Sequence, residues 1–298
     1  MNAVTNIDMH EFWSGQGGRK WLRFQEILKK GLSVFGQEAI IAASIDAGNR
    51  VLDIGCGCGD TTFDIARLVG KYGHVHGIDI SNLILNEVSN SGQSRDKKGY
   101  LHNLSFECAD VQSHKFVPNI FDVAYSRFGV MFFSNPIAAF TNIRQTLQPD
   151  GRLVFICWQS ITANQWVSLA LEVVANHISL PPPSNTEEPD AFSFGDPKRV
   201  QNILEVAGFI DISIQNYETQ FNIGADLDEA VTFLTHMGPA SCVIESLEFR
   251  SATRGHIITD LFEEIAPYET EDGVNLGAAT WIVTARKPGN KDSEFIFR

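Results

Sequence analysis

Short apolar runs alternate with helical periodicities between residues 50 and 158 of the chain. Five of these runs read as strands, at residues 51–54, 74–79, 104–110, 121–126 and 152–157. Residues 61–69 and 135–147 place apolar side chains at helical spacing, and Ser81 can cap a further helix. Residues 149–151 read as a turn. Strands that alternate with helices in this way predict an α/β fold with a doubly wound parallel sheet.

The pattern changes after residue 160. Residues 163–178 and 196–208 read as helices, residues 209–217 and 277–285 read as strands, and residues 226–265 look mostly helical. If the two later strands pair with each other, the helical block between them is an insertion over one edge of the core.

Three alternate glycines follow the first strand directly. Gly55, Gly57 and Gly59 indicate that backbone comes close to a ligand, because a side chain at these positions would block it. A dinucleotide-binding fingerprint requires glycine at position 60, where this chain has Asp60. The missing glycine weighs against a nicotinamide-dependent oxidoreductase. That function stays an alternative, because it would use the same kind of sheet.

Polar residues stand at the ends of the following strands. Ligands of parallel α/β sheets bind beyond the carboxyl ends of the strands, where Gly55, Asp79, Asp110 and Ser126 fall. Asp79 stands about 20 residues after the glycines, where an acid can accept both hydroxyls of a ribose. These positions predict a ligand with a nucleoside part.

The pattern D-x-G-x-G-x-G from Asp53 to Gly59 resembles motif I of the class I S-adenosylmethionine (SAM)-dependent methyltransferases. The resemblance covers residues 50–157 and includes Phe121-Asp122 and the segment from Leu147 to Val154. The chain is also similar, in residues 126–133 and 277–281, to a group of bacterial small-molecule methyltransferases that are distantly like quinone and sterol C-methyltransferases. The resemblance implies a Rossmann-like methyltransferase fold with a seven-stranded sheet, SAM as cofactor and S-adenosylhomocysteine (SAH) as product.

The resemblance also assigns cofactor contacts. In this family an acid at the position of Asp110 accepts a hydrogen bond from the adenine amine, and the next backbone N–H, here that of Val111, meets a ring nitrogen. Asp53 lies inside a strand, so we expect it to be buried and to bond the amides of the glycine loop. The expected cofactor-binding residues are Trp13, Asp53, Gly55, Cys56, Gly57, Gly59, Asp79, Ile80, Asp110, Val111 and Ser126.

The acceptor side carries fewer signals. Methyl transfer from a sulfonium is an in-line displacement in which the protein aligns the two molecules. Arg127 stands where an acceptor approaches and can orient an anionic or carbonyl-bearing group, and His236 is a candidate catalytic base. Residues 126–129, Ser-Arg-Phe-Gly, replace the Asn/Asp-Pro-Pro-Tyr motif of adenine-N6 and glutamine methyltransferases, which argues against those substrates.

Two features argue against a metal site. Catechol-type O-methyltransferases hold a divalent ion with an acid at the position of Ser126. Cys56 and Cys58 lack the second pair of ligands that a zinc site requires. We therefore expect no metal.

Composition narrows the remaining function classes. A net charge of −13 over 298 residues disfavours nucleic acid as a partner. We expect no signal peptide and no membrane span, and the scattered cysteines favour the reducing cytoplasm. Aromatic residues flank the core, at Phe12, Trp13, Trp21, Phe24, Trp158, Trp166, Phe192 and Phe194. They favour a small or medium-sized, largely apolar acceptor, with transfer to carbon, nitrogen or oxygen all open.

The alternative in a different class is a SAM-binding regulatory or assembly factor without turnover, which the absence of an obvious base would fit. In either case we expect the same organisation of the chain. It consists of a helical N-terminal lid (1–45), a SAM-binding core (46–160), a helical cap with the sixth strand (161–217), a helical insertion (218–275) and the last strand with a tail (276–298).

Overall fold

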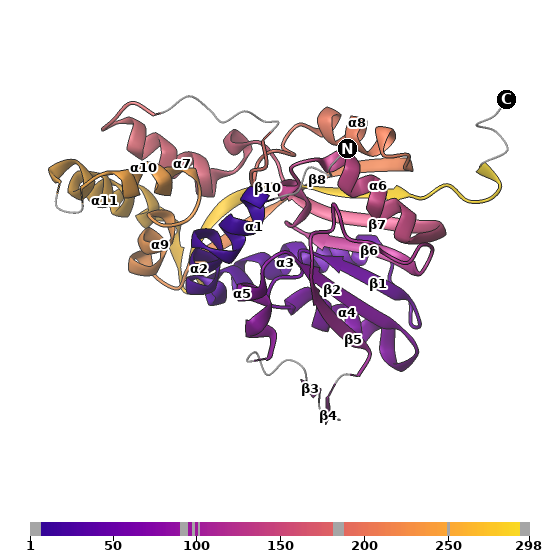
Figure 1. The fold of residues 1–298 in the computed structure, drawn as a ribbon. Coiled ribbons are helices and arrows are strands. Elements are labelled where there is room, and N and C mark those ends of the chain that lie inside the picture. The colour runs from indigo at the N-terminus through magenta and orange to yellow at the C-terminus, as the bar shows by residue number, and fades with distance from the viewer. Residues whose placement is uncertain are drawn as a thin grey trace.

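One sheet organises the molecule (Figure 1). The computed structural model describes residues 7–89, 95–96, 99–100, 102–180, 188–248 and 251–292. The main strands are β1 (Arg50–Ile54), β2 (His74–Asp79), β5 (Leu104–Cys108), β6 (Phe121–Arg127), β7 (Leu147–Trp158), β8 (Ile210–Gly224) and β10 (Gly273–Arg286). Their order is β5-β2-β1-β6-β7-β10-β8. The pairs from β5 to β7 are parallel, whereas β10 runs antiparallel to both of its neighbours.

This arrangement confirms the predicted doubly wound sheet of seven strands. Two short elements add to it. The two-residue strand β9 (Glu269–Thr270) pairs with β10, and β3 (Arg95–Asp96) pairs with β4 (Gly99–Tyr100) in a separate ribbon.

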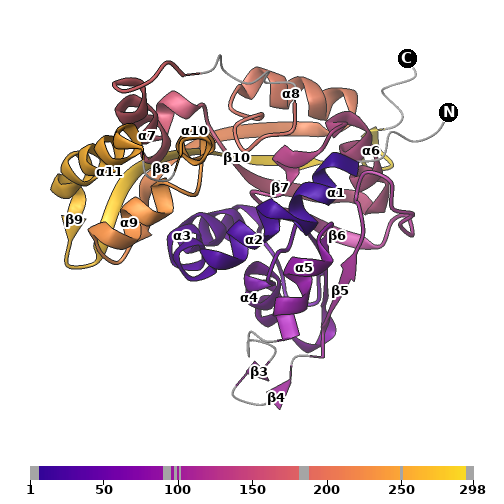
Figure 2. The same cartoon turned by 60° about the vertical axis from the view of Figure 1, so that its left-hand side comes forward.

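Helices cover both faces of the sheet (Figure 2). On one face lie α3 (Gln25–Ala43), α4 (Asp60–Val69) and the short α5 (Asn82–Leu85), and on the other lie α6 (Pro136–Thr146) and α8 (Pro197–Val206). Capping side chains determine where several of them begin. The side chain of Asn135 accepts a hydrogen bond from the N–H of Ala138, and Asp196 caps α8 in the same way. A proline follows each of these caps at the first helical position.

The strand β7 differs from its prediction. It begins at Leu147, so residues 149–151 lie inside the strand rather than in a turn before it. The turn-forming residues nevertheless bend the chain. Asp150 adopts a φ of 64°, and the residues of β7 that pair with β6 change from Leu147 directly to Arg152. The Pro-Asp-Gly segment therefore forms a bulge in β7 opposite β6.

The later half of the chain extends one end of the sheet. The strands β8 and β10 pair from Ile210 to Gly224, as the insertion hypothesis required. The helices α9 (Leu227–Leu234), α10 (Pro239–Ser246) and α11 (Ala252–Ile265) lie between these strands in the chain. They gather beside α7 (Gln165–Ala175) at that end of the sheet (Figure 1). The division of the chain into five segments stays a prediction.

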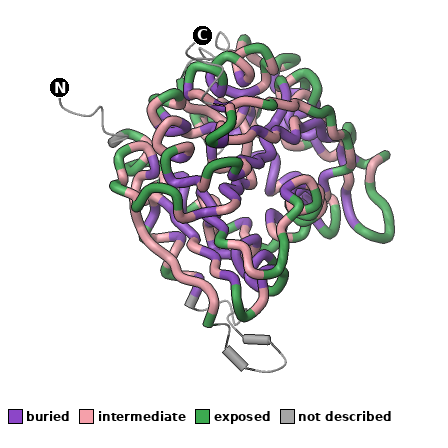
Figure 3. The backbone as a smooth tube through the Cα atoms, turned by 90° about the vertical axis from the view of Figure 1, so that its right-hand side faces the viewer, coloured by how far each residue is buried: buried purple, intermediate pink, exposed green. Residues whose placement is uncertain are grey.

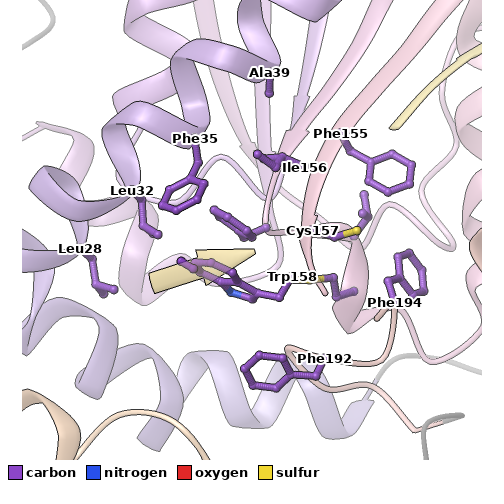
Figure 4. Packing of buried hydrophobic residues seen from close by; sticks show 14 of the residues in the cluster. Leu28, Leu32, Phe35, Ala39, Phe155, Ile156, Cys157, Trp158, Phe192 and Phe194 are labelled. Carbon is purple, nitrogen blue, oxygen red and sulfur yellow. The ribbon is translucent and has the colours of Figure 1, made fainter. Parts of the chain in front are cut away.

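Aromatic side chains join the two halves of the core. Figure 3 shows the buried backbone in the interior, with exposed residues on the outer loops and helix surfaces. The fully buried ring of Phe35, from α3, packs against Trp158 with ring centroids 5.3 Å apart (Figure 4). Its centroid also lies 5.7 Å from that of Phe128. Burying such rings stabilises the fold by about 2 kcal/mol or more each, so α3 is held firmly on the sheet.

Candidate active site

The glycine loop between β1 and α4 has the backbone geometry that its sequence predicts. Gly55, Gly57 and Gly59 all have positive φ, at 65°, 58° and 85°, which favours glycine. A Cβ on Gly55 would lie 2.9 Å from the Cα of Gly129, so these two backbones touch. A Cβ on Gly57 would meet no atom within 4 Å. Gly57 therefore faces open space, as expected where a ligand approaches.

Asp79 anchors that loop from the end of β2. Its Oδ2 accepts a hydrogen bond from the N–H of Gly57 at 2.9 Å, and its Oδ1 accepts one from Ser81 at 2.9 Å. Burial raises the pKa of this carboxyl, and the backbone N–H groups of Ser81, Gly57 and Ile80 partly offset the rise. The sequence predicted the position of this acid but not its bond to the loop.

Asp53 makes hydrogen bonds that differ from those predicted. It is buried as expected, but the prediction that it bonds the loop amides is wrong. Its Oδ2 instead accepts hydrogen bonds from the hydroxyls of Thr61 and Thr62, at 2.9 and 2.6 Å. Burial raises the pKa of Asp53 to about 6, against the lowering effect of these hydroxyls and of Arg127. Asp53 thus fixes the first turn of α4, behind the loop.

A cavity opens beside the glycine loop, at the carboxyl ends of β1, β2, β5 and β6. Its volume is about 890 Å³, counting the space at its mouth. Of the predicted site residues, it is lined by Trp13, Gly55, Cys56, Gly57, Asp79, Ile80, Asp110, Val111 and Arg127. The predicted residues Asp53, Gly59 and Ser126 lie behind this lining and support it.

Ser126 is fully buried and connects two segments of the chain through hydrogen bonds. Its Oγ donates to the carbonyl of Ile54 at 2.8 Å and accepts from the N–H of Gly129 at 3.3 Å. The hydroxyl therefore holds the end of β1 against the loop that follows β6. Its predicted direct contact with the cofactor is not supported by this geometry.

His236 does not reach the cavity. It follows α9, where its Nδ1 lies 2.8 Å from the carbonyl oxygen of Thr232 and its ring packs near Phe24. These contacts satisfy a carbonyl at the end of α9 and pack the imidazole near Phe24, the residue before α3. The candidate base is therefore a structural residue here.

Asp110 and Val111 follow β5, next to Asp79. The carboxylate of Asp110 accepts from the N–H of Gln112 at 3.0 Å, which shapes a turn. The side chain of Asn142 donates to the carbonyl of Val111 at 2.7 Å and holds this turn against α6. Because β2 pairs with β5, the two strand-end acids stand side by side in the cavity wall.

Two N-terminal helices, α1 (Ile7–Ser14) and α2 (Gln16–Arg23), close the cavity on its apolar side. Ser81 caps α5, and its hydroxyl donates to the carbonyl of Trp13 at 2.8 Å. The Trp13 ring lies edge-on to Phe132 and Trp21, with centroids 5.0 and 6.0 Å apart. Trp21 was expected among the aromatic residues around the site, but the prediction missed these lining residues: Met9, Ile54, Cys58, Asp60, Thr61, Ile78, Ile84, Ala109, Phe128, Gly129, Phe132 and Phe133. The spacing of Met9 and Trp13, four residues apart on one helix, was an available signal.

Fold and cavity together define a class I SAM-dependent methyltransferase. A family model described as a methyltransferase domain matches residues 45–208, more than half of the chain, and the chain belongs to this family. It is 28% identical over 221 residues to the ubiquinone/menaquinone biosynthesis C-methyltransferase UbiE of Cellvibrio japonicus, covering 70% of this chain and 80% of that protein. It is 34% identical over 108 residues to the aklanonic acid methyltransferase DauC of Streptomyces sp. strain C5, covering 36% and 47%.

Solved structures show the same fold. A putative methyltransferase from Bacillus halodurans has a TM-score of 0.53 at 17% identity, covering 85% of this chain and 98% of its own. The YcgJ protein from Bacillus subtilis has a TM-score of 0.54 at 14% identity, covering 88% and 99%. In the described part of the chain, no three His, Cys, Asp or Glu side chains come together as metal ligands. Within the same ranges, no helix has the length and apolar character needed to cross a bilayer.

Proposed function

We propose that this methyltransferase acts on a small or medium-sized, largely apolar molecule. The observation that carries the proposal is the aromatic wall of the cavity, which faces the glycine loop and is formed by Trp13, Trp21, Phe128 and Phe132. Aromatic linings bind apolar or planar molecules through buried area and ring contacts. The names of the two relatives, which concern quinone and aklanonic acid chemistry, are consistent with small acceptors.

The residues of the opposite wall fit SAM. In this proposal, the side chain of Asp79 accepts the ribose hydroxyls, Asp110 accepts from the adenine amine, and the N–H of Val111 faces the ring. The open space over Gly57 accommodates the methionine part, since no protein atom fills it. Ile80 and Cys56 contribute apolar surface beside the nucleoside.

The chemistry needs little from the protein beyond alignment. SAM supplies an activated methyl group, and the acceptor attacks it in line. The wall formed by α1 and α2 excludes water and brings the acceptor to the side of the cavity opposite Asp79. Cys56 and Cys58 line the cavity, but burial raises the pKa of both thiols, so they are poor bases or nucleophiles near neutral pH.

Two measurements test the proposal. Calorimetry should show binding of SAM and SAH. Radiolabelled SAM should then transfer its methyl group to components of an organic-solvent extract of cells, and not to protein or nucleic acid from the same cells. Label found only in macromolecules would contradict the proposed acceptor class, while absence of SAM binding would contradict the site itself.

A further inference from the structure

Arg127 lies nearly buried in the cavity wall. Its side chain is 12% exposed, and it lines the cavity. Among the described residues, none accepts a hydrogen bond from the guanidinium, and its one ion pair, with Asp60, spans 4.0 Å. The guanidinium nitrogens are not among the fully buried, unpartnered side-chain atoms of the described residues, so these donors reach the cavity. A ligand in the cavity that accepts these N–H groups would offset the cost of taking the charge out of water.

The carboxylates near Arg127 make no hydrogen bond to it within the described residues. The Oδ2 of Asp53 accepts two threonine hydroxyls, and its buried Oδ1 has no hydrogen-bond partner among these residues. Asp64 pairs with Arg67 at 2.9 Å, and Asp60 lies 3.6 Å from Lys29. These acids place negative charge in the neighbourhood of the guanidinium, yet none of them occupies its donors.

The α3 helix fixes where the guanidinium lies. A Cβ on Gly36 would come within 3.1 Å of the Cδ of Arg127, so the arginine stem runs over this glycine. The hydroxyl of Tyr125 donates to the carbonyl of Gly36 at 3.1 Å, which holds the helix against β6. The side chain is thus placed before any ligand arrives, and this reduces the ordering cost of binding.

We infer that Arg127 is the receptor for a carboxylate, or an equivalent planar oxyanion, bound in the cavity. The inference rests on the proposed function of the site. A guanidinium presents parallel N–H groups that match a carboxylate in a bidentate pair. Two molecules can bring this group: SAM, through its methionine carboxylate, or the methyl acceptor.

The first experiment tests the cofactor as the source. Calorimetry compares SAH with 5′-methylthioadenosine, which keeps the nucleoside and thioether but lacks the amino acid, in wild type and Arg127→Met. If the cofactor carboxylate binds Arg127, the variant weakens SAH by at least about tenfold and leaves methylthioadenosine unchanged. Arg127→Lys keeps the charge but loses the two parallel N–H donors of the guanidinium. Its affinity for SAH should lie between those of the wild type and Arg127→Met. Arg67→Met, which removes an arginine outside the cavity, is the matched control and should change neither ligand.

The second experiment tests the acceptor as the source. Protein saturated with SAH is titrated with 2-naphthoate and with 2-naphthamide, two planar probes that differ in charge. If the acceptor carries the oxyanion, wild type prefers the naphthoate by at least about tenfold and Arg127→Met loses that preference.

The outcomes separate the possibilities. A positive result in either experiment supports the inference and names the source. The inference is overturned if Arg127→Met changes neither measurement. It is also overturned if the variant lowers the affinities for SAH and methylthioadenosine equally, as a purely structural role would. Should Arg127→Met fail to fold, Gly36→Ala displaces the same guanidinium and should give a smaller loss in the same readout. Failure of the wild type to bind SAH would instead contradict the proposed function.

Discussion

The carboxylate of Asp79 holds the backbone N–H of Gly57 at 2.9 Å, so the end of β2 sets the shape of the loop that follows β1. The same carboxylate also accepts the N–H of Ser81. One residue therefore shapes the glycine loop and stands in the cavity wall where a ribose is expected. If Asp79 binds the ribose as proposed, cofactor binding and loop geometry depend on each other through this side chain.

Replacing Asp79 by alanine should reduce SAM affinity by about a hundredfold or more, because it removes the ribose acceptor and frees the loop. Asp79→Asn keeps the size and one acceptor oxygen, so it should lose less. Calorimetry gives the affinities, and thermal unfolding checks that both variants fold. SAM binding by Asp79→Ala within threefold of wild type would show that this acid does not hold the cofactor.

Gly57 offers a cleaner steric test of where the cofactor lies. Gly48, Gly57 and Gly70 all have positive φ, and a Cβ added to any of them would meet no atom within 4 Å, but only Gly57 lines the cavity. Alanine at each position should therefore cost about 1 kcal/mol of unfolding free energy. Gly57→Ala alone should also weaken SAM by at least about tenfold, since its methyl group enters the space for the ligand. Equal SAM affinity in all three variants would place the cofactor elsewhere.

The local features of the site could be predicted from the sequence because each depends on a few neighbouring residues. Alternate glycines after a strand determine a tight loop, and an acid at a strand end determines a polar wall. Asp79, Asp110 and the glycines were located in this way. The number of strands in the sheet came from the family resemblance rather than from any periodicity, and their order was not predicted.

The features that were missed depend on contacts between distant segments. The bond from Ser81 to Trp13 joins residues 68 apart, and Lys20 pairs with Glu245 across 225 residues. No local pattern specifies such pairs. Asp53 is a different case, because Thr61 and Thr62 are only eight and nine residues away. Its strand position predicts burial but not the choice between loop amides and the threonine hydroxyls of α4.

Replacing His236 should have almost no effect on SAM affinity or methyl transfer. Its Nδ1 lies 2.8 Å from the carbonyl of Thr232, and asparagine can donate from a similar position. His236→Asn should therefore keep SAM affinity and methyl transfer within about twofold of wild type and cost less than about 1 kcal/mol of stability. A tenfold loss of transfer with unchanged SAM affinity would return this residue to the catalytic machinery.

Asp53 makes the stability of the fold depend on pH. Its pKa rises from 3.8 to about 6 on folding, because burial disfavours the charged carboxylate. Below 3.8 the group is protonated in both states, so its neutral form adds no penalty. Between pH 3.8 and about 6 the folded protein keeps a proton that the unfolded chain has already lost, so the free energy of unfolding falls as the pH rises through this range. Above about 6 both states are ionised and this contribution stays constant.

Asp53→Asn removes that titration while keeping an acceptor for Thr61 and Thr62. The variant should gain stability relative to wild type as the pH rises from about 4.5 to about 7.5, by about 2 kcal/mol in total. Urea unfolding at several pH values measures this difference, and the other buried acids, including Asp79, cancel because both proteins carry them. A difference that stays constant with pH would mean that Asp53 is ionised in the folded protein throughout, with the threonine hydroxyls and Arg127 outweighing the effect of burial.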